Sequence, residues 1–198
     1  MSHEVQGSAD RPCESRVLGK IDDVAEFVDV YRLLNAEDYA AVWVRIREWL
    51  AKYPDSADAH IIAGEATMEE SDEDPATEGS EDAAFKRALG YLERAIELAP
   101  KHADAWSELA KVYFAMGRYQ DSYEAAGTGV EALRFRESYL EDDYVYDNVG
   151  AQLYCTAALA AHRGGRPDLA SACLDCAKQR FPDQITCIGP AEAEILRK

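Results

Sequence analysis

The chain repeats one spacing of apolar residues, and this repeat restricts the chain to an all-α array. Trp106, Leu109 and Tyr113 lie three or four residues apart, and Gly117 separates them from a second apolar run. Residues at this spacing share one face of a helix. Each helix pair of this kind leaves an apolar face uncovered, so neighbouring pairs must stack to build a continuous core. The spacing therefore predicts consecutive helix pairs packed side by side.

The helix before Pro100 shows the second half of such a pair most clearly. Its partner is predicted at 57–69, where Gly64 is small enough to let two helix backbones approach closely. The apolar face that leads to Pro100 is formed by Ala88, Leu92, Ala95 and Leu98.

These residues resemble the tetratricopeptide repeat, a helix pair of about 34 residues with the pattern W-x2-L-G-x2-Y, then A-x3-F, then Pro. Trp106, Leu109 and Tyr113 match this pattern, and Ala110 and Ser122 stand at its small positions. The resemblance implies a right-handed α-solenoid of about four helix pairs plus a C-terminal capping helix. The second helix departs from the pattern at Ala126, Gly129 and Arg134.

The intervals between matching residues assign the units. Pro54 and Pro100 are 46 residues apart, about 12 more than one period, and Gly117 and Gly165 are 48 residues apart. Each interval implies an insertion, at 68–81 in the second unit and at 137–150 before the fourth. The predicted organisation is a flexible arm at 1–20, a solenoid at 21–183 with units at about 23–56, 57–102, 103–136 and 151–183, and a C-terminal cap at 184–198.

Three segments lie outside the repeat pattern. The acidic run 68–81 lacks apolar periodicity and is expected to form a solvated loop. In 137–150, Val149 continues the spacing of the next helix, so part of this insertion is expected to lengthen that helix. After Pro190, the segment 191–197 can form a short helix that covers the open end of the array.

The composition disfavours two classes of partner. The formal net charge is −17 and the pI is about 4.6, whereas nucleic acids and anionic membranes are bound mainly through Lys and Arg. A basic protein segment is favoured by long-range attraction, but acidic composition also simply keeps proteins soluble. No apolar run approaches the roughly 20 residues of a membrane-spanning helix. The polar amino terminus lacks a signal-peptide pattern, and we expect a cytoplasmic protein.

The cysteines do not form the framework of a small secreted domain, and reduced thiols are expected. Cys173 and Cys176 could supply half of a zinc site, because two residues three apart on a helix share a face. No second paired motif completes the four ligands, so we expect no metal. The five cysteines are Cys13, Cys155, Cys173, Cys176 and Cys187.

Enzymatic motifs find no support in the sequence. The four histidines are far apart and none belongs to a recognisable nucleophile system. The acidic segment lacks the ligand spacing of a calcium-binding loop, and there is no Gly-rich phosphate loop. We therefore expect no cofactor and no catalytic residue.

The resemblance implies that the first helix of each unit lines a concave groove. Apolar and acidic groups dominate these positions, which predicts aromatic anchors combined with carboxylates that orient a Lys or Arg of the partner. Phe27 and Phe114 fit the core equally well. The predicted groove residues are Phe27, Tyr31, Asp58, Ile61, Glu65, Ser107, Glu108, Lys111, Phe114, Gln152, Cys155 and Leu159.

One known use of the family is disfavoured. Repeat domains that clamp the acidic carboxyl terminus of chaperones require Lys, Asn and Arg on successive first helices, because a carboxylate needs cationic and amide donors. The matching positions here would not pair with a carboxylate. They hold Phe27, Tyr31, Ile62, Asp104 and Glu108.

Binding of another protein is thus the predicted function. The first hypothesis is a non-catalytic adaptor or chaperone-like module that holds an apolar and basic partner segment in the groove. The alternative is a structural subunit of a larger assembly, which binds through the convex face or through the Tyr-rich insertion 137–150. The sequence leaves the oligomeric state and the identity of the partner open.

Overall fold

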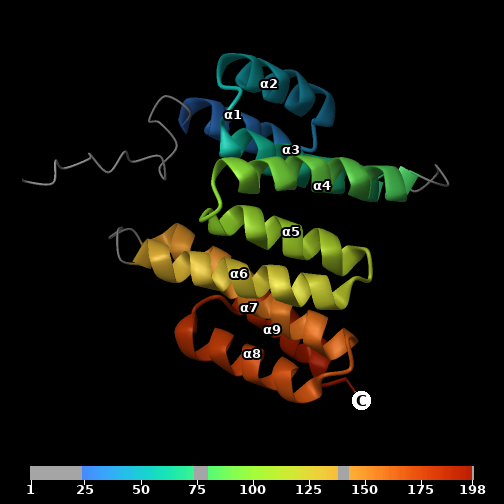
Figure 1. Ribbon diagram of the computed structural model, residues 1–198, viewed down its shortest axis with the longest axis vertical. Coiled ribbons are helices and arrows are strands. Elements are labelled where there is room, and N and C mark those ends of the chain that lie inside the picture. The colour runs from blue at the N-terminus through green and yellow to red at the C-terminus, as the bar shows by residue number, and fades with distance from the viewer. Residues whose placement is uncertain (1–23, 74–79, 138–142, 198) are drawn as a thin grey trace, which may run out of the picture.

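The computed structural model describes residues 24–73, 80–137 and 143–197, and these ranges consist of helices joined by short turns. The predicted arm at 1–20 lies outside them. The described ranges contain nine helices, and successive helix pairs follow one another along the long axis of the molecule (Figure 1). They are α1 Val24–Leu34, α2 Tyr39–Lys52, α3 Ala57–Glu73, α4 Ser80–Leu98, α5 Ala103–Ala115, α6 Tyr119–Glu137, α7 Asp143–Arg163, α8 Pro167–Arg180 and α9 Ile185–Ile195.

Consecutive helices pack as four hairpins: α1 with α2, α3 with α4, α5 with α6, and α7 with α8. The ninth helix, α9, packs on α7 and α8 and closes one end of the stack. The predicted α-solenoid of four helix pairs plus a terminal helix is confirmed.

Small residues allow the paired helices to approach closely. Gly64 on α3 faces Leu92 on α4, and a Cβ atom at Gly64 would lie 2.8 Å from Leu92 Cγ. In the next hairpin, Ser122 is fully buried and its hydroxyl donates a hydrogen bond of 2.8 Å to the carbonyl oxygen of Ala110. The small positions predicted at Gly64 and Ser122 are therefore where the helices of each hairpin meet.

The apolar core is continuous along the stack. It runs from a cluster among α1, α2 and α3, through one among α4, α5, α6 and α7, to one among α7, α8 and α9. Burial of these faces is the main stabilising term, as in other helical arrays. The largest fully buried side chains include Ile46, Trp49, Ile62, Leu92 and Leu153.

The prediction of a solvated loop over 68–81 is wrong at both ends of this range, where the chain is helical. Helix α3 continues to Glu73 and α4 begins at Ser80, while 74–79 lie outside the described residues. The extension of α3 is tied to α2, because Trp43 Nε1 donates a hydrogen bond of 3.0 Å to Glu70 Oε2. This hydrogen bond holds the acidic end of α3 against α2, so this end can be helical without an apolar face of its own.

Two other helices begin before the unit predicted at 151–183 and before the helix predicted at 191–197. Helix α7 begins at Asp143 and so takes up much of the insertion 137–150. Helix α9 begins at Ile185 and contains Pro190, where a helix start after the proline was expected. Pro190 lacks an N–H group and costs one helical hydrogen bond. Ile188 and Ala191 are buried on either side of it, and their packing offsets this cost.

Candidate functional site

The hairpins are arranged so that their first helices form the inner side of a curve. Helix α1 packs on α3, α3 on α5, α5 on α7, and α7 on α9. The second helices α2, α4, α6 and α8 lie farther apart and meet through long side chains, such as those of Trp43 and Tyr91, whose ring centroids are 6.1 Å apart. Since the first helices are close together and the second helices are spread apart, the concave face is lined by the first helices. The residues that the repeat pattern assigned to a groove belong to these first helices.

A cluster of polar side chains from three first helices lies in this groove. At its centre, Lys111 Nζ forms an ion pair of 2.5 Å with Glu108 Oε1, one turn away on α5. The charges of the surrounding carboxylates act on both Lys111 and the hydroxyl of Tyr31. We call this set the groove cluster; its members are Tyr31, Glu65, Glu69, Asp104, Glu108 and Lys111.

The electrostatics of the groove cluster are dominated by excess negative charge. Burial and, to a smaller extent, the charge of Glu108 raise the pKa of Glu65 to about 7 against the opposing effect of Lys111. Burial also raises the pKa of Glu108. Burial works against the charged form of Lys111, but Glu108 and Glu65 outweigh it, so the pKa of Lys111 is raised. Lys111 therefore stays protonated beside acids that it does not fully neutralise.

Glu65 is the carboxylate with the least compensation. Within the described ranges it forms no ion pair, whereas Glu108 is paired with Lys111. A buried acid without a paired cation is costly, and the cost is reduced by taking up a proton or by the approach of a positive group. The groove thus offers a place for a cationic side chain.

An aromatic pair stands beside the groove cluster at the α1 end. The rings of Phe27 and Tyr31 stack with centroids 5.2 Å apart, and the two side chains are 39% and 37% exposed. Burial raises the pKa of Tyr31, and the groove carboxylates raise it further, so the hydroxyl stays neutral. The pair offers an exposed apolar surface next to the acids.

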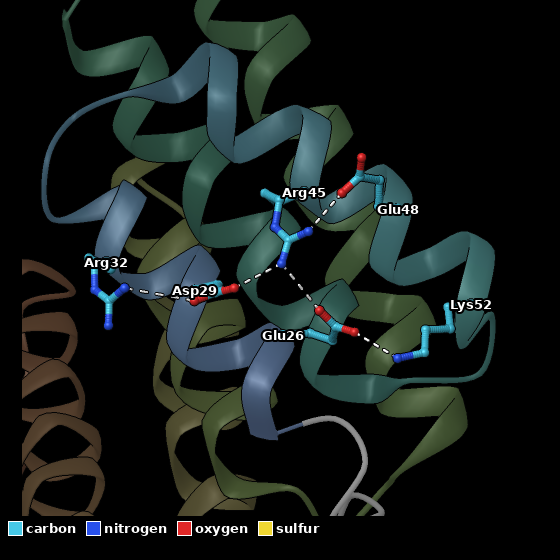
Figure 2. A network of polar contacts seen from close by, with 6 residues as sticks. All are labelled: Glu26, Asp29, Arg32, Arg45, Glu48 and Lys52. Carbon is cyan, nitrogen blue, oxygen red and sulfur yellow. Dashed lines mark hydrogen bonds and ion pairs between the residues drawn. The ribbon is translucent and has the colours of Figure 1, made fainter.

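An ion-pair network fixes the helix that carries these aromatics (Figure 2). Arg45 on α2 reaches Asp29 at 2.9 Å and Glu26 at 3.4 Å on α1, and also pairs with Glu48 at 2.8 Å. Lys52 pairs with Glu26 at 2.9 Å. Single exposed ion pairs contribute little stability. These pairs, however, join residues of α1 to residues of α2 and so help to orient α1 against α2.

Several residues that were predicted to line the groove are instead packed against other parts of the chain. Ile61 is 6% exposed and packs with Ala95 and Ala105 in the core. Ser107 is 1% exposed, and Leu159 packs into the cluster among α7, α8 and α9. The chain itself covers these side chains, because the tilt of one hairpin on the next buries positions that lie on the inner face of an isolated helix. Ile61 and Ser107 are therefore not available to a partner.

Other predicted residues contact other parts of the chain. Asp58 Oδ1 lies 3.0 Å from His102 Nε2, so Asp58 interacts with the residue that immediately precedes α5. The ring of Phe114 lies 5.5 Å from that of Tyr119 at the α5–α6 turn. Gln152 is half-buried on α7 and donates a hydrogen bond of 3.4 Å to Asn148. The structure therefore brings together Tyr31, Glu65, Glu108 and Lys111 of the predicted set, with Phe27 beside them.

Sequence reasoning missed Glu69 as a groove residue, because Glu69 is the last residue of the helix predicted at 57–69 and was grouped with the acidic insertion 68–81. Glu69 lies one turn after Glu65 on α3, and its charge acts on Tyr31, Glu65 and Lys111. The spacing of four residues was the signal that could have identified it. The Tyr-rich alternative interface at 137–150 lies largely outside the described side chains.

A hollow of about 440 Å³ lies near the end of the stack, between the last turns of α7 and α9. Arg163 and Glu194 in its wall are paired at 2.7 Å, so part of its polar lining is already occupied. Because its lining is polar, it offers no apolar anchor for a peptide. The lining residues are His162, Arg163, Glu194 and Arg197.

The described ranges contain no group of three or more His, Cys, Asp or Glu side chains placed to hold a metal ion. None of the helices in the same ranges is both long enough and apolar enough to pass through a bilayer.

Comparisons with known proteins agree with this architecture. Residues 81–140 match the family model described as Tetratricopeptide repeat. A TPR protein of Thermus thermophilus superposes with a TM-score of 0.71 at 15% identity, over 89% of this chain and 82% of that one. The structure of Pseudomonas aeruginosa PilF superposes with a TM-score of 0.67 at 16% identity, over 87% of this chain and 67% of that one. At these identities the likeness shows the fold. None of the curated proteins matches the sequence.

Proposed function

We propose that this chain, which is a tetratricopeptide repeat protein, is a non-catalytic module that holds an apolar and basic segment of another protein in its groove. Tetratricopeptide repeat proteins generally mediate protein–protein interactions and are typically non-catalytic scaffolds. The partner class, the groove as the binding surface and the cytoplasm as the location are parts of the proposal. An adaptor and a chaperone-like module would both use this surface.

The observation that carries the proposal is the carboxylate of Glu65 in the groove cluster. Within the described ranges it forms no ion pair, whereas Glu108 pairs with Lys111 and Asp104 pairs with His102. A Lys or Arg side chain of a partner that enters beside Glu65 would make charge-assisted hydrogen bonds in a half-buried site, where such bonds are strongest. An acidic segment would meet repulsion at the same place.

The aromatic pair supplies the second part of the recognition. Phe27 and Tyr31 expose ring surface that a partner's apolar side chain would cover. Aromatic anchors flanked by charged groups are the usual arrangement of interface residues that dominate binding. A segment that combines apolar and basic residues therefore matches both parts of the groove.

Titration of the full chain with three labelled peptides tests the proposal. The first is amphipathic with Lys and Leu, the second replaces each Lys by Glu, and the third replaces each Leu by Ala. We expect fluorescence anisotropy to show micromolar binding of the first peptide, weakened by added salt. We expect weaker binding of the third and no binding of the second. A peptide with the acidic carboxyl-terminal sequence of a heat-shock chaperone should behave like the second.

Two variants locate the binding surface. Glu65→Gln should weaken binding of the basic peptide, whereas Glu93→Gln, on the exposed side of α4, should not. Equal affinity for the Lys and Glu peptides would contradict the proposed partner class. Equal loss in both variants would show that net charge, and not the groove, is responsible.

A further inference from the structure

Two cysteines that are far apart in the sequence meet where the last helix packs on the array. Cys155 lies on α7 and is 3% exposed, and Cys187 lies on α9 and is half-buried. Both thiols belong to the apolar cluster that joins α7, α8 and α9. The thiol of Cys155 donates a hydrogen bond to the sulfur of Cys187. The two side chains therefore face each other where α9 packs on α7, and both residues are free thiols.

We propose that Cys155 and Cys187 form an oxidation site, at which hydrogen peroxide produces a disulfide that joins α9 to α7. In the first step the Cys187 thiolate attacks one oxygen of the peroxide, giving a sulfenic acid and hydroxide. In the second step the sulfur of Cys155 attacks the sulfenic sulfur, the S–S bond forms and water leaves. Overall, two thiols are oxidised, one peroxide is reduced, and two waters are released.

The surroundings make Cys187 the thiol that reacts first. Cys187 is partly exposed, whereas Cys155 is almost completely covered. The hydrogen bond from Cys155 lowers the pKa of Cys187, burial opposes this effect, and the positive charge of Lys111 supports it. The same hydrogen bond raises the pKa of Cys155. The thiolate is the nucleophilic form, so Cys187 attacks the peroxide and Cys155 resolves the sulfenic acid.

The pair noticed in the sequence, Cys173 and Cys176, is less suited to this reaction. Both residues lie on α8, and side chains three apart on a helix have Cβ atoms about 5–6 Å apart. A disulfide needs Cβ atoms about 3.5–4.5 Å apart. The thiol of Cys173 also interacts with the hydroxyl of Tyr123. Oxidation within the folded chain should therefore select Cys155 and Cys187.

The disulfide would link α9 covalently to α7. Helix α9 packs on α7 and α8 through a small apolar face with Ile188 and Ala191 at its centre. A covalent link would restrict the opening of α9, because it removes conformations from the unfolded and partly unfolded chain. This consequence does not depend on what the groove binds.

Peptide mapping of the oxidised full chain tests the proposal. The reduced protein is treated with hydrogen peroxide, blocked with N-ethylmaleimide and digested with trypsin without reduction. Cys155 and Cys187 lie on different tryptic peptides, whereas Cys173 and Cys176 share a third one. We expect a linked peptide pair containing Cys155 and Cys187 as the main product. The melting temperature should rise by several degrees on oxidation and return after dithiothreitol is added.

Trapping with dimedone assigns the order of the two steps. In Cys155→Ser the sulfenic acid should accumulate on Cys187 and be labelled, whereas in Cys187→Ser residue Cys155 should stay unlabelled. Recovery of both Cys155 and Cys187 as maleimide adducts from peroxide-treated folded protein would overturn the proposal. So would a main product linked between Cys173 and Cys176. The mapping of the unsubstituted chain decides the question even if a variant fails to fold.

Discussion

Glu37 occupies the place in the α1–α2 turn that Gly117 occupies in the α5–α6 turn. Both residues have positive φ, 58° for Glu37 and 71° for Gly117. In each turn the following N–H donates to a carbonyl five residues back, from Asp38 to Leu33 at 3.1 Å and from Arg118 to Tyr113 at 2.9 Å. This is the Schellman ending of a helix, which favours glycine at the left-handed position. The first repeat keeps the geometry of the third at a conformational cost that falls on Glu37.

Glu37→Gly should therefore stabilise the protein. A left-handed residue with a side chain costs about 1–2 kcal/mol, and part of this gain is lost to the greater freedom of glycine in the unfolded chain. We expect a net gain of roughly 0.5–1 kcal/mol, or about 1–4 °C in melting temperature, measured by calorimetry. The reciprocal variant Gly117→Ala should lose a similar amount. A lower melting temperature for Glu37→Gly would show that its side chain is needed in the turn.

Two glycines within helices should respond in opposite ways to alanine. A Cβ atom at Gly64 would lie 2.8 Å from Leu92 Cγ, whereas at Gly127 no atom lies within 4 Å. Gly127 is exposed in the interior of α6, where it neither packs against another helix nor ends this one. Gly64→Ala should destabilise the protein by about 1–3 kcal/mol through overpacking. Gly127→Ala should stabilise it by about 0.5–1 kcal/mol. Chemical denaturation of both variants would separate the effects, and equal shifts would contradict the packing of α3 on α4.

Glu65 should make stability fall as the pH rises. Its carboxyl ionises near pH 4.5 when unfolded and near pH 7 when folded. The folded chain binds the extra proton between these values, so its stability decreases through this window and stays lower above it. Glu65→Gln should be more stable than the parent by about 2 kcal/mol at pH 8 and nearly equal to it at pH 4.5. Glu93→Gln controls for the loss of one charge. A Glu65→Gln advantage that does not change between these pH values would contradict the burial of this acid.

The protonation of His102 should make stability depend on pH in a second, higher range. Burial alone would lower its pKa, but hydrogen bonds with Asp104 and Asp58 outweigh this effect and raise the pKa to about 9. The charged ring stabilises the fold below pH 6.5, and this contribution disappears as the pH rises through 9. The destabilisation by His102→Ala should thus be larger at pH 6 than at pH 10, by about 2–3 kcal/mol. Asp58→Asn should reduce this pH dependence, and should have no such effect in the His102→Ala background.

The sequence was sufficient for the parts of the fold that depend on local spacing. The apolar residues from Ala88 to Leu98 lie on one helix face wherever the helix packs, and Gly64 had to meet a neighbouring helix. It was not sufficient to predict the side chains that a neighbouring hairpin covers. Ile61 and Ser107 were predicted for the groove together with Glu65 and Glu108, but they are buried, because the packing of one hairpin on the next decides which inner positions remain open.

Contacts between segments that are distant in the sequence could not be predicted from the repeat pattern. The pairing of Cys155 with Cys187 depends on how α9 packs, and α9 lacks the consensus residues that assign the other helices. The extension of α3 depends on the bond from Trp43 to Glu70, which joins two units. Of the charged residues of the groove cluster, Glu65, Glu108 and Lys111 were predicted from their places on first helices, whereas Glu69 was missed at the boundary of the acidic insertion.

Reversal of charge at Glu65 should separate binding from folding. The lysine introduced by Glu65→Lys would stand near Glu69 and Glu108, so this variant should keep or raise the melting temperature, and it would reduce the negative charge of the groove. A charge pair in a half-buried interface is worth about 1.5 kcal/mol or more, so binding of the basic peptide should weaken about tenfold or more. Adding Glu108→Lys should lower the melting temperature, because it breaks the ion pair with Lys111 and leaves two cations one turn apart. Parallel titration and thermal melts would measure both effects. If Glu65→Lys bound the basic peptide as tightly as the parent does, the peptide would be bound at some surface other than the groove cluster.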